Sequence, residues 1–328
     1  MSRNLVTDVE GVSVGHATDL ALGSGVTAIV FDRLSVASVV VRGGAPAGRD
    51  LGILDLDTTL CEVDAIVLSG GSGFGLDSTT GVQAALRDMG RGIVFGGVLL
   101  PIAPTAILFD LTNGGNKDWG RYPPYRELGY QAVMAAGADF ALGSVGAGTG
   151  ATTATLKGGL GSASAKTSDG HTVGAVVAVN AVGTATVGDG PHFWAAPFER
   201  DGEFGGLGLP STFDVRLHTK MGPPRGTATT IGLVVTDATL TQPQAKRMAA
   251  MADDGLARAV LPAHAPMDGD TVFAASTGRR ELADHKALME LGHVAGMVMA
   301  RAVARAVFHA TRLPYPPSMP AWSDRFGG

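Results

Sequence analysis

Apolar residues along the chain form short continuous runs in some segments and helical spacing in others. The short runs predict strands, and they occur at 25–32, 36–43, 64–71, 172–183 and 229–237. The last two contain long unbroken apolar stretches, which are typical of strands buried on both faces of a sheet.

Helical spacing of apolar residues predicts helices among these strands. One helix is expected to begin after Asp77, a suitable N-cap, and a short one covers 123–137. Thr241 and Gln244 have the spacing of a capping box, followed by apolar residues on one helical face. A longer helix is expected over 281–311, where small residues occupy several faces.

Alternating strands and helices predict layers of sheet covered by helices. No charged or Pro/Ser-rich linker divides the chain, so we expect an α/β fold with one domain over residues 1–328. The apolar stretch 92–109 has the length of a membrane span. Its three glycines and two prolines favour two core strands joined by a turn instead. We therefore expect a soluble protein that has no membrane partner.

Composition and charge narrow the class of partner. Hydrophobic residues make up 45% of the chain and charged residues 17%, which argues against disorder. The low charge and the 48 glycines favour a compact body partly covered by other subunits, so we expect a homo-oligomer. The size that we expect for it is a tetramer. The net charge of −5 and the lack of a basic stripe argue against a nucleic-acid partner.

The single cysteine, Cys61, cannot form an internal disulfide, which suits a reducing compartment. Cys61 precedes an apolar strand, so a packing role explains it better than nucleophilic chemistry. The N-terminal residues lack the apolar core of a signal peptide. Together these features predict a cytoplasmic protein.

Motifs for cofactors and metals are incomplete in this sequence. The glycines of 69–76 do not give a dinucleotide fingerprint, and this stretch is either a tight turn or the lining of a pocket at a helix N-terminus. Ser72 is not in a nucleophile elbow, because position 74 is phenylalanine. Glu290 and His293 have metal-ligand spacing but no second such pair. We therefore expect no cofactor and no metal.

Two aspartates, Asp268 and Asp270, stand at the start of a predicted strand, close to His264. One interpretation is a turn that precedes the strand. The other is a carboxylate pair that orients a catalytic amine or hydroxyl group. The sequence pattern leaves both interpretations open.

Two adjacent threonines, Thr229 and Thr230, begin another buried strand. Threonine favours strands, which is one explanation. The other is that one hydroxyl is a nucleophile that uses its own α-amine as base, once the chain is cut just before it. A free α-amine has a pKa of about 8 and can accept a proton near neutral pH. The preceding segment, HTKMGPPRGTA, has the character of a loop that can be severed.

Several blocks of sequence resemble the L-aminopeptidase/D-esterase family, which includes β-peptidyl aminopeptidases and 6-aminohexanoate-oligomer hydrolases. These blocks are VEGVSVGHATD, ILFDLTNGG, RYPPYRELGYQA, VGAGTGATTATLKGGLGSAS, AVVAVNAVG, GTATTIGLVVTDATLT and MDGDTVFA. They run in the family's order over residues 8–310. The resemblance implies a four-layer α/β/β/α sandwich like that of N-terminal-nucleophile hydrolases.

The resemblance also implies a precursor that cuts itself after Ala228 into 1–228 and 229–328, which remain partners. It implies these site residues: Thr229 as nucleophile, Asn180 and the Leu108 N–H as oxyanion donors, Tyr122 near the reacting centre, Asp268 and Asp270 orienting the amine, and Lys157 as the family's lysine. The substrates would be short peptides, β-peptides, amino-acid amides or 6-aminohexanoate oligomers.

This sequence departs from the family in having Ala228 where members usually have asparagine. A second hypothesis is therefore an uncut relative without catalytic activity, acting as a small-molecule binding or assembly protein. The two hypotheses predict two bands and one band, respectively, on a denaturing gel.

Overall fold

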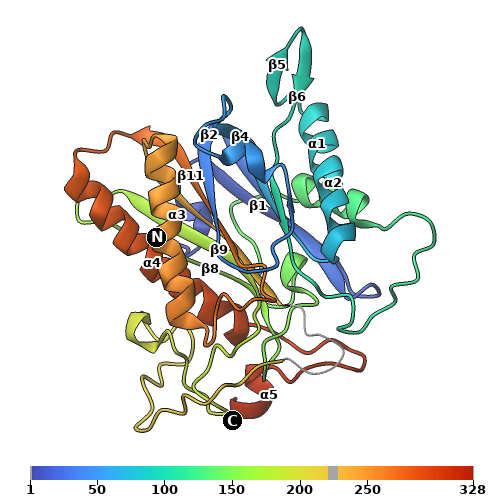
Figure 1. Ribbon diagram of the computed structural model, residues 1–328, viewed down its shortest axis with the longest axis vertical. Coiled ribbons are helices and arrows are strands. Elements are labelled where there is room, and N and C mark those ends of the chain that lie inside the picture. Colours follow the sequence, from blue (N-terminus) through green and yellow to red (C-terminus); the bar gives the residue numbers. More distant parts are fainter. Residues whose placement is uncertain (1, 221–227, 328) are drawn as a thin grey trace.

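The computed structural model describes residues 2–220 and 228–327 (Figure 1). Its strands are β1 (Val12–Asp19), β2 (Ser24–Val41), β3 (Gly48–Arg49), β4 (Glu62–Ser69), β5 (Ile93–Phe95), β6 (Val98–Leu100), β7 (Thr105–Ile107), β8 (Gly159–Lys166), β9 (Thr172–Asn180), β10 (Thr229–Ala238) and β11 (Thr271–Arg280). Its α-helices are α1 (Ser78–Asp88), α2 (Tyr125–Met134), α3 (Gln242–Ala259), α4 (His285–Phe308) and α5 (Trp322–Phe326).

One hydrogen-bonded sheet runs through the molecule in the order β3-β7-β4-β2-β11-β10-β9-β8, and β1 pairs with β2. The first half of β2 pairs with β1, and its last residues pair with β11. The prediction of two strands at 25–32 and 36–43 was therefore wrong, because β2 is continuous. Asp32 and Arg33, where the first predicted strand ends, are exposed side chains within the continuous strand.

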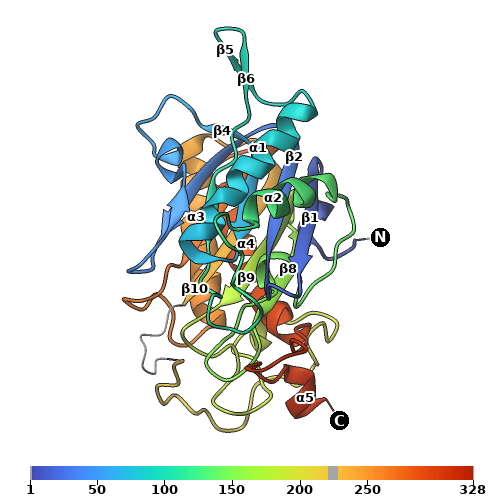
Figure 2. The same ribbon diagram turned by 90° about the vertical axis from the view of Figure 1, so that its right-hand side faces the viewer.

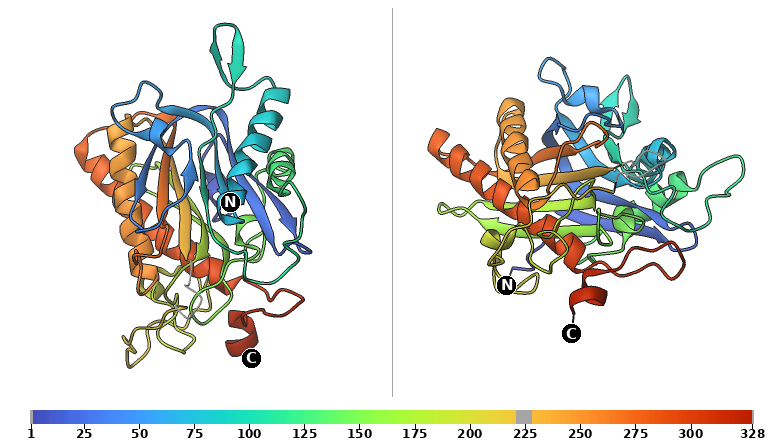
Figure 3. Two further views of the ribbon diagram at one scale, coloured as in Figure 1. Left: turned by 45° about the vertical axis from the view of Figure 1, so that its right-hand side comes forward. Right: turned by 60° about the horizontal axis from the view of Figure 1, so that its bottom comes forward.

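Three clusters of buried side chains show that the sheet forms two layers between two helical layers (Figure 3). The central cluster joins side chains of β1, β2 and β4 to side chains of β9, β10 and β11. The helices α3 and α4 cover the outer face of one layer, and α1 and α2 cover the other. The expected α/β/β/α sandwich is confirmed, and β2 belongs to both sheet layers.

The strands β9 and β10 are buried at every residue, as predicted. In β9, Val177 and Val179 pack toward the α3–α4 layer, and Val176 and Ala178 pack into the central cluster. The two strands therefore lie in the interior of the sandwich, where water is excluded from their sides.

The segment 92–109 differs from the expected pair of core strands. Only β7 is buried, whereas β5 and β6 form a hairpin that projects from the body (Figures 1 and 2). Val94 of this hairpin is 63% exposed, although it is apolar. The helix α4 is long and apolar enough to cross a membrane, but 83% of its most apolar window is buried inside the molecule.

Of the two predicted helix caps, the one at Thr241 is confirmed and the one at Asp77 is wrong. Thr241 and Gln244 form the capping box that begins α3. Asp77 precedes α1 but does not cap it, because its backbone already has helical angles. Its carboxylate accepts a hydrogen bond from Arg126 instead, at 3.2 Å.

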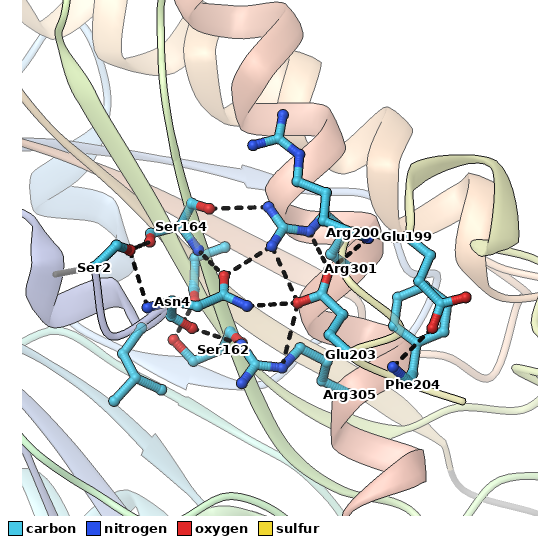
Figure 4. Close-up of polar contacts among 12 residues, drawn as sticks. Ser2, Asn4, Ser162, Ser164, Glu199, Arg200, Glu203, Phe204, Arg301 and Arg305 are labelled. Carbon is cyan, nitrogen blue, oxygen red and sulfur yellow. Dashed lines mark hydrogen bonds and ion pairs between the residues drawn. The ribbon is translucent and has the colours of Figure 1, made fainter. Parts of the chain in front are cut away.

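A buried ionic network joins four distant segments of the chain (Figure 4). Glu203 accepts hydrogen bonds from Arg301 of α4, at 2.5 and 3.0 Å, and from Asn4, at 2.6 Å. Arg301 also donates to the Ser164 carbonyl of β8, at 2.9 Å. The long segment that leads from β9 toward β10 is thereby fixed to the body at Glu203.

Candidate active site

Thr229 and Asn180 meet where two central strands end. Thr229 is the first residue of β10, Asn180 is the last residue of β9, and the two are paired in the antiparallel register. Thr229 is 6% exposed and Asn180 is fully buried. The sheet thus places a hydroxyl group and a carboxamide side by side in a site largely shielded from water.

The peptide bond between Ala228 and Thr229 is held by the segment that contains the two aspartates. The Ala228 carbonyl accepts hydrogen bonds from the Thr229 hydroxyl, at 2.5 Å, and from the Gly269 N–H, at 3.0 Å. A Cβ atom on Gly269 would lie 2.7 Å from Thr229 Oγ1. Only glycine therefore allows this close approach. The hydroxyl lies against the carbonyl of the bond that precedes it.

Asp270 fixes the backbone just after Thr229. Its Oδ1 accepts a hydrogen bond from the Thr230 N–H, at 2.7 Å, and its Oδ2 accepts from His264 Nδ1, at 2.9 Å. His264 Nε2 also lies 3.4 Å from Asp253. Asp253 and Asp270 together raise the pKa of His264 from 6.5 to about 10, so the imidazole is protonated.

Asp268 has one carboxylate oxygen in use and one without a partner. Its Oδ2 accepts from the Ala265 N–H, at 3.1 Å. Its Oδ1 is buried and forms no hydrogen bond of good geometry within residues 2–220 and 228–327, although the Val182 N–H lies close enough to this carboxylate to lower its pKa. Burial and the neighbouring Asp270 raise the pKa of Asp268. An acceptor of this kind suits a positively charged or proton-donating group close by.

The Asn180 amide is oriented by contacts on both of its ends. Its Oδ1 accepts from the Thr152 N–H, at 3.0 Å, and from Lys220 Nζ, at 2.8 Å. Its Nδ2 donates to the Phe109 carbonyl, at 2.9 Å. Lys220 was not among the residues predicted from the sequence. No motif marks it, because its contact with Asn180 exists only in the folded chain.

The Leu108 N–H, which the resemblance implies as an oxyanion donor, already donates a hydrogen bond in this structure. It donates to the Ser69 carbonyl, at 2.9 Å, and the Leu108 carbonyl accepts from Ser72 on the same side. In extended chain the next residue points the other way. The Phe109 carbonyl indeed points toward Asn180, and the Phe109 N–H donates no hydrogen bond within the described residues.

Lys157 has no hydrogen bond to Thr229, Asn180 or the two aspartates in the described part of the chain. Its Nζ donates to the carbonyls of Gly148, Ala151 and Gly158, at 3.1, 2.7 and 2.8 Å. Burial lowers the pKa of Lys157 to about 7. Its ammonium therefore holds together the loop that carries Thr152, which in turn contacts Asn180.

Tyr122 is 74% exposed, and its ring contacts the guanidinium of Arg121. No hydrogen bond joins it to Thr229, Asn180 or the two aspartates in the described part of the chain. The glycine-rich stretch 69–76 leads from the end of β4 into a 3-10 helix, Ser72–Asp77, and the Gly71 N–H just before this helix donates to Asp110, at 2.8 Å. The Asp110 carboxylate therefore already accepts from the Gly71 N–H, and a ligand would have to displace it.

Comparison with known proteins assigns the sequence to a family of enzymes. The profile of peptidase family S58 matches residues 4–316. An uncharacterised aminopeptidase of Mycobacterium tuberculosis (strain H37Rv) is 37% identical over 349 residues, covering 99% of this chain and 98% of the relative. A 6-aminohexanoate-oligomer endohydrolase of Paenarthrobacter ureafaciens is 28% identical, covering 84% of this chain and 75% of the relative.

Two solved structures share the fold. A β-aminopeptidase of Burkholderia sp. has a TM-score of 0.72 at 22% identity, over 98% of this chain and 91% of that one. The L-aminopeptidase D-Ala-esterase/amidase of Ochrobactrum anthropi, a variant of the Ntn-hydrolase fold, has 0.70 at 21% identity, over 99% and 94%. The expected likeness to N-terminal-nucleophile hydrolases is confirmed at the level of the fold.

Proposed function

The chain belongs to peptidase family S58 and is a hydrolase of peptide or amide bonds, and from that premise we propose that it cuts itself before Thr229 and then uses this residue as nucleophile. The observation that carries the proposal is the pair of hydrogen bonds to the Ala228 carbonyl. It is contacted by the Thr229 hydroxyl on one side and by the Gly269 N–H on the other.

Self-cleavage follows from these contacts. Attack of Thr229 Oγ1 on the Ala228 carbonyl carbon forms a C–O bond, and the Gly269 N–H stabilises the developing oxyanion. The C–N bond then breaks, and the hydroxyl proton passes to the departing nitrogen. Water hydrolyses the resulting ester, which gives 1–228 with a new carboxylate and 229–328 with a free α-amine.

The free α-amine of Thr229 is then the base for turnover, because its pKa of about 8 lets it take the hydroxyl proton near neutral pH. The unpartnered Oδ1 of Asp268 is an acceptor for the new amine. Asn180 Nδ2 and the Phe109 N–H are the oxyanion donors, with Phe109 in place of Leu108. The substrate acyl group forms an ester with Thr229 Oγ1, the amine leaves, and water releases the acid.

The substrate class that we propose is a short amide-linked chain: a peptide, a β-peptide, an amino-acid amide or a 6-aminohexanoate oligomer. The relatives are named as an uncharacterised aminopeptidase, a 6-aminohexanoate-oligomer endohydrolase and a β-aminopeptidase, which supports this range. The same relatives argue against the alternative of a non-catalytic binding or assembly protein.

A homo-oligomer, a tetramer, is part of the proposal. The projecting hairpin of β5 and β6 exposes four large apolar side chains, Val94, Phe95, Val98 and Leu100. An isolated two-stranded hairpin is only marginally stable in water. Contact with a second copy of the chain would cover these side chains, and the hairpin is the element that we expect at that interface.

A denaturing gel of the purified full chain tests the function. We expect two bands, and N-terminal sequencing of the smaller one should begin Thr229-Thr230-Ile231. Thr229→Ala should leave one full-length band, whereas the matched control Thr230→Val should still be cut. Activity on amino-acid amides, β-peptides and 6-aminohexanoate oligomers then identifies the substrate. One full-length band after long incubation of the unaltered chain would overturn self-cleavage and favour the alternative.

A further inference from the structure

Lys220 places its ammonium group among four oxygen acceptors at the candidate active site. Nζ donates to the Asn180 carbonyl, at 2.9 Å, to Asn180 Oδ1, at 2.8 Å, and to the carbonyl and hydroxyl of Thr152, at 3.1 and 3.3 Å. The backbone N–H of Lys220 also donates to the Val182 carbonyl, at 3.1 Å. Both the main chain and the side chain of Lys220 are therefore fixed to the end of β9.

These contacts determine which way the Asn180 amide faces. Two donors, the Thr152 N–H and the Lys220 ammonium, converge on Oδ1, and the Phe109 carbonyl receives Nδ2. The reversed amide would turn its NH₂ group toward two donors and its oxygen toward a carbonyl. Such an arrangement leaves buried groups unsatisfied, at a cost of about 1–3 kcal/mol for each group.

The surroundings of Lys220 balance its charge only in part. Burial lowers its pKa to about 7, while the carboxylates of Asp268 and Asp270 act in the opposite direction. A buried ammonium group is expensive unless its hydrogen bonds are satisfied. Here all four acceptors of the ammonium group belong to Asn180 and Thr152, so its position and that of the Asn180 amide depend on each other.

We propose that Lys220 is a positioning residue of this hydrolase, which holds the Asn180 amide with Oδ1 turned toward Lys220 and Nδ2 turned away from it. One N–H of Nδ2 donates to the Phe109 carbonyl, and the other is then left for the oxyanion of the reacting bond. The inference rests on the proposed role of Asn180 as an oxyanion donor. Lys220 acts through Asn180 and does not itself touch the reacting atoms. It precedes the cut and stays with residues 1–228.

Lys220→Met tests the proposal in the self-cleaved enzyme, because methionine keeps the length of the side chain but removes the donors. We expect kcat to fall about tenfold or more and KM to change little. A misplacement of about 1 Å can reduce the rate roughly hundredfold, so the expected loss lies between these two values. Lys246→Met is the control. Lys246 lies on the surface, 3.8 Å from Asp55, and its loss should leave kcat unchanged.

Lys220→Ala gives a second test by chemical rescue. Propylammonium replaces the missing part of the side chain, so added n-propylamine should restore kcat severalfold. The same amine should not accelerate the unaltered enzyme or Asn180→Ala, and 1-propanol should not rescue. A purely structural role would lower the melting temperature without rescue by the amine.

The outcomes separate this inference from the proposed function. If Asn180→Ala retains full activity, the oxyanion role fails and this inference fails with it. If Asn180→Ala is inactive but Lys220→Met keeps the kcat of the unaltered enzyme, only the role of Lys220 is overturned. Absence of rescue in a folded Lys220→Ala variant would also overturn it.

Discussion

Thr229 and Asn180 face each other across two antiparallel strands, as the first residue of β10 and the last residue of β9. The nucleophile and an oxyanion donor of the proposed mechanism are therefore set by backbone pairing rather than by flexible loops. Sites built on strands hold their geometry more closely than sites on loops. Changes to either side chain should alter chemistry while leaving the sheet intact.

Asn180→Ala should reduce kcat by about 10²–10³, the usual effect of removing one oxyanion donor. Its main-chain pairing in β9 remains, so circular dichroism should still show the folded protein. Steady-state kinetics on the best substrate measures the effect. Unchanged kcat in this variant would contradict the assigned role.

Gly269→Ala should slow self-cleavage by about tenfold or more. The added methyl group would displace the reacting hydroxyl, and a displacement of up to about 1 Å reduces the rate strongly. The added Cβ would lie 2.7 Å from Thr229 Oγ1 and 3.0 Å from the Ala45 carbonyl. Gly52→Ala is the matched control, because a Cβ there meets nothing within 4 Å. A time course on a denaturing gel compares the two. Equal rates would show that Gly269 is not needed for the cut.

His264→Asn should lower the melting temperature most at acidic and neutral pH. The folded chain raises the pKa of His264 from 6.5 to about 10, so the protonated ring stabilises the folded state fully below pH 6.5. That contribution declines as the pH rises toward about 10. Asparagine tolerates the left-handed backbone of this residue, with φ of 57°.

Thermal unfolding of the unaltered chain and of His264→Asn at pH 6, 8 and 10 measures this dependence. The difference between the two melting temperatures should shrink as the pH rises. A difference that stays constant over this range would mean that the charge of His264 contributes nothing to stability.

Phe95→Asp should shift the protein to a smaller assembly, because it places a charge on the exposed hairpin of β5 and β6. Burying an unpaired carboxylate at an interface is costly. Met289→Asp is the control, since Met289 is 61% exposed on α4, away from the hairpin. Light scattering after size exclusion gives the mass of each. An unchanged mass for Phe95→Asp would exclude the hairpin from the interface.

Much of the fold could be predicted because apolar patterning reflects burial directly. The strands β9 and β10 carry long apolar runs, and α3 begins with a capping box, so local sequence is sufficient there. The continuity of β2 could not be predicted, because exposed polar residues within a strand look like a loop. The hairpin at 93–100 was also misjudged, since its apolar residues suggested a core position that it does not occupy.

The site residues were predicted chiefly from family blocks, and their roles stay predictions. Whether Leu108 or Phe109 offers a free backbone N–H depends on the direction in which each N–H points. That direction cannot be predicted from the residue types. Lys220 lies 2.8 Å from Asn180 although 40 positions separate them in the chain. Tyr122 matched a block by order, but its side chain faces solvent.

The sheet order β2-β11-β10-β9 has a consequence for the cut protein. The fragment 229–328 would supply β10 and β11, which lie between β2 and β9 of the other fragment. Neither piece could leave without breaking main-chain ladders on both sides and opening the central core. Cleavage after Ala228 would therefore produce a heterodimer whose two chains separate only when the whole molecule unfolds.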